Sequence, residues 1–117
     1  MTKVSIATDE PRISVNAMLR LRALVDVHNE RQRQIDRKGW TEYHDDTQHA
    51  AGGDIALAAA AYAIAGLPLA ALALGLLLEA LRKRGWEVRP KLDRRDNLVR
   101  AGALIIAEIE RLDRAGE

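Results

Sequence analysis

A short acidic stretch carries most of the side chains in this sequence that are suited to chemistry. Within thirteen residues the chain places six acidic or imidazole side chains, with no Lys or Arg between them: Glu42, His44, Asp45, Asp46, His49 and Asp54. Clustered carboxylates repel one another, so the folded state needs a compensating partner. A divalent cation is the commonest such partner, and solvent or a helix N-terminus is the alternative without chemistry.

The run His44-Asp45-Asp46-x-x-His49 is open to several interpretations. As a zinc site it supplies imidazole and carboxylate ligands, although the spacing is not that of a metalloprotease helix. As a Mg²⁺ site, Asp45 or Asp46 joins carboxylates from other helices in an oxygen-rich shell. As a structural element, one of its side chains caps the next helix. A histidine–aspartate phosphohydrolase, with His28 and Asp96, is a further option for which the chain is short.

Two carboxylates outside this stretch interrupt apolar helical stripes. The stripe of the first expected helix continues at helical spacing into Glu30 and Gln34, and Glu108 lies within the stripe of the last helix. A charged side chain on the core-facing side of a helix should pair with an opposite charge, bind a metal or lie where the core opens to solvent. Helix bundles build carboxylate metal sites from facing helices, so Glu30 and Glu108 are candidate ligands. The alternative is pairing with an Arg such as Arg31 or Arg100.

Cations gather in the part of the chain after residue 81. Positions 82 to 100 hold eight cations against three acids: Arg82, Lys83, Arg84, Arg89, Lys91, Arg94, Arg95 and Arg100. The N–H donors of an Arg guanidinium match the geometry of phosphate oxygens, so some of these cations are candidates for binding a polyphosphate. The alternative is a basic turn that is simply exposed to solvent. Trp40 and Trp86 either stack on a base or plug the end of the bundle. No known nucleic-acid-binding motif accompanies this basic segment, so sequence-specific binding of nucleic acid is not expected.

The composition predicts an all-α fold that positions these groups. The chain of 117 residues has no Phe and only 3% aromatic residues, and Ala and Leu dominate, which favours packed helices over a sheet. Residues 1–12 are expected to form a flexible arm and residues 13–117 a single helical-bundle domain. A net charge of +1 gives no global attraction to nucleic acid or membrane, and the absence of Cys excludes thiolate chemistry. Without a secretory signal, a cytoplasmic location is expected.

Four main helices are expected in the bundle. Ser14 is the predicted N-cap of a first helix that runs to about Lys38 and ends at Gly39. This helix has two apolar stripes, so we expect partners on both sides. Asp93 is the predicted N-cap of the last helix, which spans about residues 94 to 114.

The middle of the chain is an uncharged Ala/Leu-rich stretch. Residues 55–78 contain no charge in twenty-four positions, which is long enough for a membrane span. Gly66-Leu67-Pro68 indicates the end of one helix and the start of another, which favours a central antiparallel hairpin over a membrane-associated one. Such a hairpin presents more apolar surface than two amphipathic helices cover, so we expect a homo-oligomer.

Several motifs look familiar. The segments ERQRQ, GWTEYHDD-x-x-H and RRDNLVRAGALIIAEIERLDRA together resemble a largely uncharacterised family of small proteins encoded by phages and prophages. The resemblance runs from about residue 29 to residue 115. This chain departs from the family pattern at Tyr43, where an acid is expected, and at Gly53-Asp54, where Gly-Glu is usual.

More distantly, acids on facing helices are similar to those of the MazG-type all-α nucleotide pyrophosphohydrolases. Those enzymes bind Mg²⁺ through E-x-x-E on one helix and E-x-x-D on another, whereas here Glu30 is followed by Gln34 at i+4, and Glu110-x-x-Asp113 has the second spacing. The resemblance implies hydrolysis of (d)NTPs at the α–β linkage. The implied catalytic residues are Glu30, Asp45 and His49, the implied Mg²⁺ ligands are Glu30, Asp45, Asp46 and Glu108, and the implied substrate contacts are Gln34, Trp40, Lys91, Arg94 and Arg95.

Two other functions fit the same residues. A non-enzymatic phage accessory protein would bind a nucleotide or a host protein through the same polar pocket. A membrane-associated helical hairpin is the third option, and a membrane is the less expected partner.

Overall fold

A computed structural model describes residues 14–39 and 53–116 of the chain. Within these two ranges the chain forms four α-helices and one short 3₁₀ helix, and no strand: α1 (Val15–Lys38), α3 (Asp54–Ile64), η2 (Pro68–Ala70), α4 (Ala71–Lys83) and α5 (Arg94–Ala115). The predicted all-α class is confirmed. The predicted arm at residues 1–12 lies outside the described residues.

The ends of the two long helices follow from local side-chain chemistry. The Ser14 hydroxyl accepts a hydrogen bond from the Ala17 N–H at 3.0 Å, and Gly39 adopts a left-handed φ of 70° just after α1. The Asp93 carboxylate accepts from the Arg95 N–H at 3.0 Å at the start of α5. Each cap satisfies a backbone group that the helix leaves without a partner. The predicted limits of both helices are confirmed.

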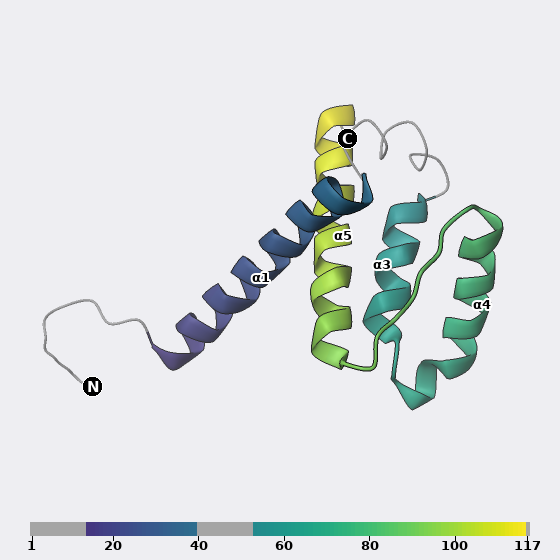
Figure 1. Ribbon diagram of the computed structural model, residues 1–117, viewed down its shortest axis with the longest axis horizontal. Helices are drawn as coiled ribbons and strands as arrows, with labels where there is room; N and C mark the ends of the chain where they lie inside the picture. The colour runs from purple at the N-terminus through teal and green to yellow at the C-terminus, as the bar shows by residue number, and fades with distance from the viewer. Residues whose placement is uncertain (1–13, 40–52, 117) are drawn as a thin grey trace, which may run out of the picture.

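The core lies between α3 and α5, which form the most extensive helix contact of the described chain (Figure 1). Alanines on both helices allow the two backbones to approach closely, and a few larger side chains fill the remaining space. The buried apolar residues of this core are Ile55, Ala58, Ala59, Ala61, Tyr62, Leu81, Trp86, Ala101, Leu104 and Ala107. Small residues therefore set the spacing of this layer.

Helix α4 flanks α3 and contributes less to the core than its composition suggests. Gly66 has a φ of 87° and Pro68 opens η2, so the chain breaks between the two Ala/Leu segments as predicted. Leu81 is the buried residue of α4, whereas Leu72 is 78% exposed. The expectation that both segments form the centre of the bundle is therefore correct only for α3. No helix in residues 14–39 and 53–116 has the length and hydropathy needed to cross a bilayer.

Helix α1 packs on α5 through its second half. At Gly102 a Cβ atom would lie 3.1 Å from the Val27 side chain, so the two helices are in close contact there. Glu30 and Gln34 are buried on the same side, as the stripe analysis predicted. The first half of α1 extends away from the other helices (Figure 1). Its large apolar residues are at least half exposed, so the second predicted partner of α1 is not among the described residues.

Candidate functional site

A cation-lined cavity of about 560 Å³ lies where α1, α3, α5 and the α4–α5 connection meet. Four of its lining residues are basic and one is acidic: Lys38, Tyr62, Gly85, Trp86, Glu87, Arg89, Lys91 and Arg100. Arg89 and Glu87 pair with each other at 2.9 Å. This group of residues, called the cationic cavity below, has an excess of positive charge suited to an anion.

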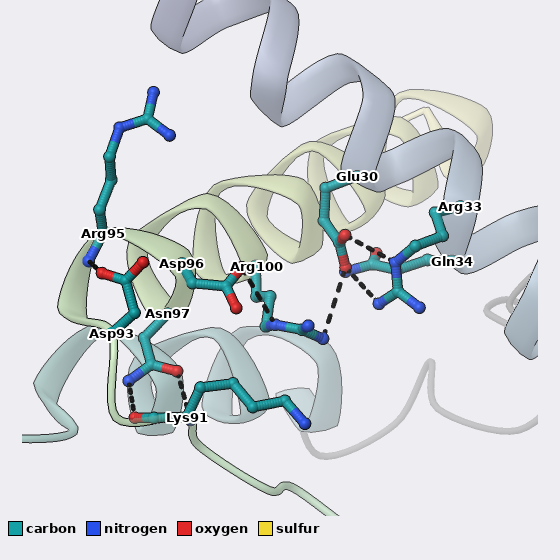
Figure 2. A network of polar contacts seen from close by, with 9 residues as sticks. All are labelled: Glu30, Arg33, Gln34, Lys91, Asp93, Arg95, Asp96, Asn97 and Arg100. Atoms are coloured by element: carbon teal, nitrogen blue, oxygen red, sulfur yellow. Dashed lines mark hydrogen bonds and ion pairs between the residues drawn. The ribbon is translucent and has the colours of Figure 1, made fainter.

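The connection between α4 and α5 brings five of these residues to the cavity. Its start is fixed by Trp86, which is buried and whose N–H donates to the Leu81 carbonyl at 2.9 Å. Its end is fixed by Asn97, which is 1% exposed. The Lys91 N–H donates to Asn97 Oδ1 at 2.7 Å, and Asn97 Nδ2 donates to the Lys91 carbonyl at 2.8 Å. Asn97 thus holds Lys91 against α5 with both groups of its amide (Figure 2).

The double hydrogen bond of Asn97 gives a first testable prediction. Replacing Asn97 with Ala removes both bonds and leaves two backbone groups of Lys91 without their partner, so we expect a loss of about 1–3 kcal/mol in the free energy of unfolding. Chemical denaturation measures it. The matched control is Asn29→Ala on the exposed side of α1, where a change within about 0.5 kcal/mol is expected. Equal effects of the two substitutions would contradict the role of Asn97.

A second cavity, of about 340 Å³, lies between α1 and the start of α5. It is rich in carboxylates and is lined by Asp26, Asn29, Glu30, Arg33, Asp93, Arg95, Asp96 and Val99. We call it the acidic cavity. Its most buried carboxylate is Glu30, which is 9% exposed.

Glu30 is held in a network of side chains from α1 and α5. The Arg33 guanidinium donates to both Glu30 oxygens at 2.8 and 2.7 Å, and Gln34 Nε2 donates to Glu30 Oε2 at 3.3 Å. Burial favours the neutral acid, but the hydrogen bond and charge of Arg33, the charge of Arg100 and the Gln34 bond together outweigh it, so the pKa of Glu30 lies below its ordinary value. Glu30 is therefore ionised at neutral pH.

Arg100 connects the two cavities. It lines the cationic cavity, while its Nη1 lies 3.9 Å from Glu30 Oε2 and its Nε lies 3.6 Å from Asp96 Oδ1 (Figure 2). Both separations exceed hydrogen-bond length, and Nε is buried without a hydrogen-bond partner among the described residues. Among the described residues the Arg100 guanidinium thus makes two long ion pairs, and the side chain also borders the cationic cavity, where it adds positive charge.

The pKa of Lys38 is lowered by burial and, to a smaller extent, by the positive charges around it. Desolvation of its ammonium is the largest influence, and the charges of Arg33, Arg100 and Lys91 add to it, so its pKa is lowered from the ordinary value although Glu30 acts in the opposite direction. Figure 2 shows the Lys91 side chain extending towards the same side as the Arg100 guanidinium. A bound anion would relieve this repulsion.

The lowered pKa of Glu30 predicts a pH-dependent contribution to stability. Since its pKa is lower in the folded state, Glu30 contributes stability above its unfolded pKa and loses it as the pH falls through the folded pKa. We therefore expect Glu30→Gln to destabilise the protein at neutral pH and to differ less from wild type in acid. Urea denaturation at pH values from about 7 to about 3 measures this difference.

The matched control is Glu79→Gln on α4, because Glu79 also pairs with an Arg at i+3 but is exposed. Water screens such a surface pair, so a small effect is expected at every pH. A penalty for Glu30→Gln that stays constant from neutral to acidic pH would contradict the assignment.

Two predicted substrate contacts have structural roles instead. Arg94 Nη1 donates to the backbone carbonyls of Ala63 and Ala65 at 2.9 and 3.1 Å, which satisfies the C-terminal end of α3. The Arg95 side chain pairs with Asp26 of α1 at 2.7 Å. These interactions occupy both Arg side chains, so the predicted roles of Arg94 and Arg95 as phosphate ligands are not supported by the described contacts. Lys91 lines the cationic cavity, and its role as a substrate contact stays a prediction.

Glu108 and Glu30 line different cavities in the part of the chain that the structure describes. The Glu108 carboxylate is held by Arg111 at 2.7 and 3.3 Å, and Glu108 lines an apolar groove between α3 and α5. Since each carboxylate is held by an Arg of its own helix and lines a different cavity, the described contacts do not support the predicted pairing of Glu30 and Glu108 in one metal site. Glu110, on the predicted E-x-x-D segment, pairs with the buried Arg31 at 3.1 Å.

Several predicted site residues lie outside the described part of the chain. These are Trp40, Asp45, Asp46 and His49, together with Glu42 and His44. Asp54, the last acid of the stretch, is described: it is 1% exposed at the start of α3 and pairs with Arg84. An acid in the first turn of a helix is also stabilised by the helix dipole.

The described residues offer few ligands for a divalent cation. No three His, Asp or Glu side chains converge on a metal-binding position within residues 14–39 and 53–116. Next to Glu30, however, the Gln34 Oε1 acceptor is buried and has no hydrogen-bond partner among them. One carboxylate and one amide oxygen fit Mg²⁺, which commonly keeps several waters and completes its shell with substrate phosphates.

Sequence reasoning singled out Glu30, Gln34 and Lys91, but it missed the central roles of Arg100, Lys38 and Asn97. Arg100 was noted as one of eight cations and as an alternative pairing partner of Glu30 or Glu108, and it does lie 3.9 Å from Glu30. Its spacing of four from Asp96 was a further available signal. The molecule is an all-α protein with adjoining cationic and acidic cavities. No protein-family model, curated protein or solved structure matches the chain.

Proposed function

We propose that the chain binds the phosphates of a nucleotide in the cationic cavity and acts on (d)NTPs as a Mg²⁺-dependent pyrophosphohydrolase-like protein. The observation that supports this proposal is the position of Arg100, which lines the cationic cavity while lying 3.9 Å from the buried Glu30. A phosphate bound to Arg100 would lie next to an ionised carboxylate. The motif resemblance suggests a role in phage nucleotide metabolism.

The cationic cavity supplies the groups that phosphate binding requires. Lys38, Lys91 and Arg100 would neutralise phosphate charge, which is the main requirement of phosphoryl-transfer sites. The buried Tyr62 and Trp86 add apolar walls, as small-molecule sites usually have. The base and the sugar would then lie towards these walls.

Hydrolysis would take place in the acidic cavity, on the side of Arg100 that faces Glu30. Glu30 and Gln34 Oε1 would hold Mg²⁺ there, and bound Mg²⁺ supplies charge neutralisation at the phosphates and a more acidic water. Glu30 is ionised at neutral pH, and its lowered pKa favours binding a cation over accepting a proton. Asp45, Asp46 and His49 stay predicted ligands or catalytic groups.

The second candidate, a nucleotide-binding protein without turnover, is favoured by one observation. Arg33 donates to both oxygens of Glu30, so the carboxylate is already neutralised within α1. If this pair persists with ligand bound, Glu30 is a structural residue and the cationic cavity is only a binding site. The two candidates therefore differ in whether Arg33 releases Glu30.

The test combines binding and turnover on the same samples. Thermal shifts are measured with pyrophosphate and with a panel of dNTPs, each with and without Mg²⁺, and released pyrophosphate and monophosphate are then quantified. We expect stabilisation by pyrophosphate and Mg²⁺-dependent turnover of dNTPs. Glu30→Gln should keep pyrophosphate binding and lose turnover by about 100-fold or more.

Each outcome separates the candidates. Stabilisation by nucleotides without turnover in any metal would favour the binding protein. Turnover that survives Glu30→Gln would remove Glu30 from the catalytic assignment. No stabilisation by pyrophosphate or by any dNTP would overturn both candidates.

A further inference from the structure

Tyr62 carries a polar group on the most apolar helix of the protein. The sequence of α3 is DIALAAAAYAI, so every other residue of this helix after Asp54 is Ala, Leu or Ile. Tyr62 is 4% exposed and lines the cationic cavity. A buried phenol has a hydroxyl that needs a hydrogen-bond partner, whereas a Leu or Phe in the same place would have no such need.

The hydroxyl of Tyr62 has no hydrogen-bond partner within residues 14–39 and 53–116. Its electrostatic surroundings are those of the Glu30 network. The pKa of Arg33 is raised, chiefly by its hydrogen bond to Glu30, and the electrostatic influence of Tyr62 is one of the smaller causes. The phenol thus lies within electrostatic range of Arg33, while the Tyr62 side chain borders the cationic cavity.

The other polar groups that line this cavity are mostly donors. Three cations come from three different elements, which are α1, the α4–α5 connection and α5: Lys38, Lys91 and Arg100. The acid in the lining, Glu87, pairs with Arg89. Ammonium and guanidinium groups have no acceptor to offer a phenol, but a phenol is itself able to donate. Tyr62 therefore adds, from α3, a neutral donor to a cavity of cationic donors.

We propose that the Tyr62 hydroxyl donates a hydrogen bond to a terminal phosphate of the ligand in the cationic cavity, beside Arg100. A terminal phosphate presents three acceptor oxygens, so it is able to accept from donors on several sides at once. A phosphodiester presents fewer. This role of Tyr62 rests on the proposed function, because it concerns the same cavity and the same ligand, and it makes Tyr62 a binding residue as well as an apolar wall.

Tyr62→Phe tests this role, because the substitution removes the hydroxyl and keeps the ring. Isothermal titration calorimetry with pyrophosphate compares the variant with wild type. We expect Tyr62→Phe to bind about 10-fold more weakly or worse, since it lacks a hydrogen bond to a charged acceptor. The thermal midpoint of the ligand-free variant should equal that of wild type, because the hydroxyl has no bond to lose within the described part of the chain.

A spectroscopic measurement separates direct contact from an effect on packing. The chain contains two tyrosines, so tyrosine labelled with ¹³C at Cζ gives two NMR signals, and Tyr62→Phe identifies the signal of Tyr62. The chemical shift of Cζ depends on the hydrogen bonding of the attached hydroxyl. Saturating pyrophosphate should therefore move the Tyr62 signal of wild type.

The outcomes distinguish this role from the proposed function. Wild-type affinity for pyrophosphate in Tyr62→Phe would overturn the role of Tyr62 and leave the proposed function standing, and so would a Cζ signal that does not move at saturation. A clear drop in the thermal midpoint of the ligand-free variant would place the partner of the hydroxyl within the protein and would also overturn the role. If wild type does not bind pyrophosphate, the proposed function fails as well.

Discussion

Replacing Arg100 with Met is expected to weaken pyrophosphate binding by about 10- to 100-fold, because a charge-assisted hydrogen bond contributes roughly 1.5–3 kcal/mol. Arg100 lies at the junction of the two cavities, with its guanidinium at 3.9 Å from Glu30 and 3.6 Å from Asp96. Met retains the apolar stem of Arg, so the packing along α5 should be preserved. Isothermal titration calorimetry with pyrophosphate measures the change.

Arg89 provides the matched control for this experiment. It lines the same cavity, but its side chain is 77% exposed and pairs with Glu87. Arg89→Met should therefore weaken pyrophosphate binding by only about 3-fold or less, as expected for an exposed charge. If Arg100→Met binds pyrophosphate as wild type does, or if both variants lose the same affinity, Arg100 is not the anion ligand.

The second large effect concerns stability. Leu104 is 1% exposed in the core between α3 and α5, so Leu104→Ala is expected to reduce the free energy of unfolding by about 2–5 kcal/mol. Five of the nine other buried residues of this core cluster are alanines, which have no flexible side chains to fill the space. The loss should therefore lie towards the upper end of that range. Urea denaturation monitored by circular dichroism measures it.

The same substitution on α4 is the control. Leu72 is 78% exposed, so Leu72→Ala should change the free energy of unfolding by no more than about 0.5 kcal/mol. A large loss at Leu72 would mean that α4 is covered in solution, which the described helix contacts do not show. A small loss at Leu104 would contradict the position of the core.

Helix existence and helix ends were predictable because local chemistry determines them. Ser14 and Asp93 cap their helices through hydrogen bonds to residues close in sequence, and the left-handed conformations of Gly39 and Gly66 end helical segments. The apolar stripe of α1 correctly indicated that Glu30 and Gln34 are buried. Each of these features depends on neighbours within about one or two turns.

The partners of the charged residues were not predictable in the same way. Arg94, Arg95 and Arg100 are close in sequence and identical in chemistry, yet one caps α3, one pairs with α1 and one joins two cavities. Helical spacing gives the direction of a side chain relative to its own axis, but the interhelical packing decides what lies opposite. The same limit explains why Glu108 was placed with Glu30.

The sequence by itself determined the all-α class, the limits of α1 and α5, and the burial of Glu30 on a core-facing stripe, because these depend on composition, caps and periodicity. Only the tertiary structure decided that Lys38, Lys91 and Arg100 share one cavity, that Arg100 lies beside Glu30, and that one apolar helix and one apolar groove are left uncovered. Those facts depend on contacts between residues far apart in the chain, and no local pattern encodes such contacts.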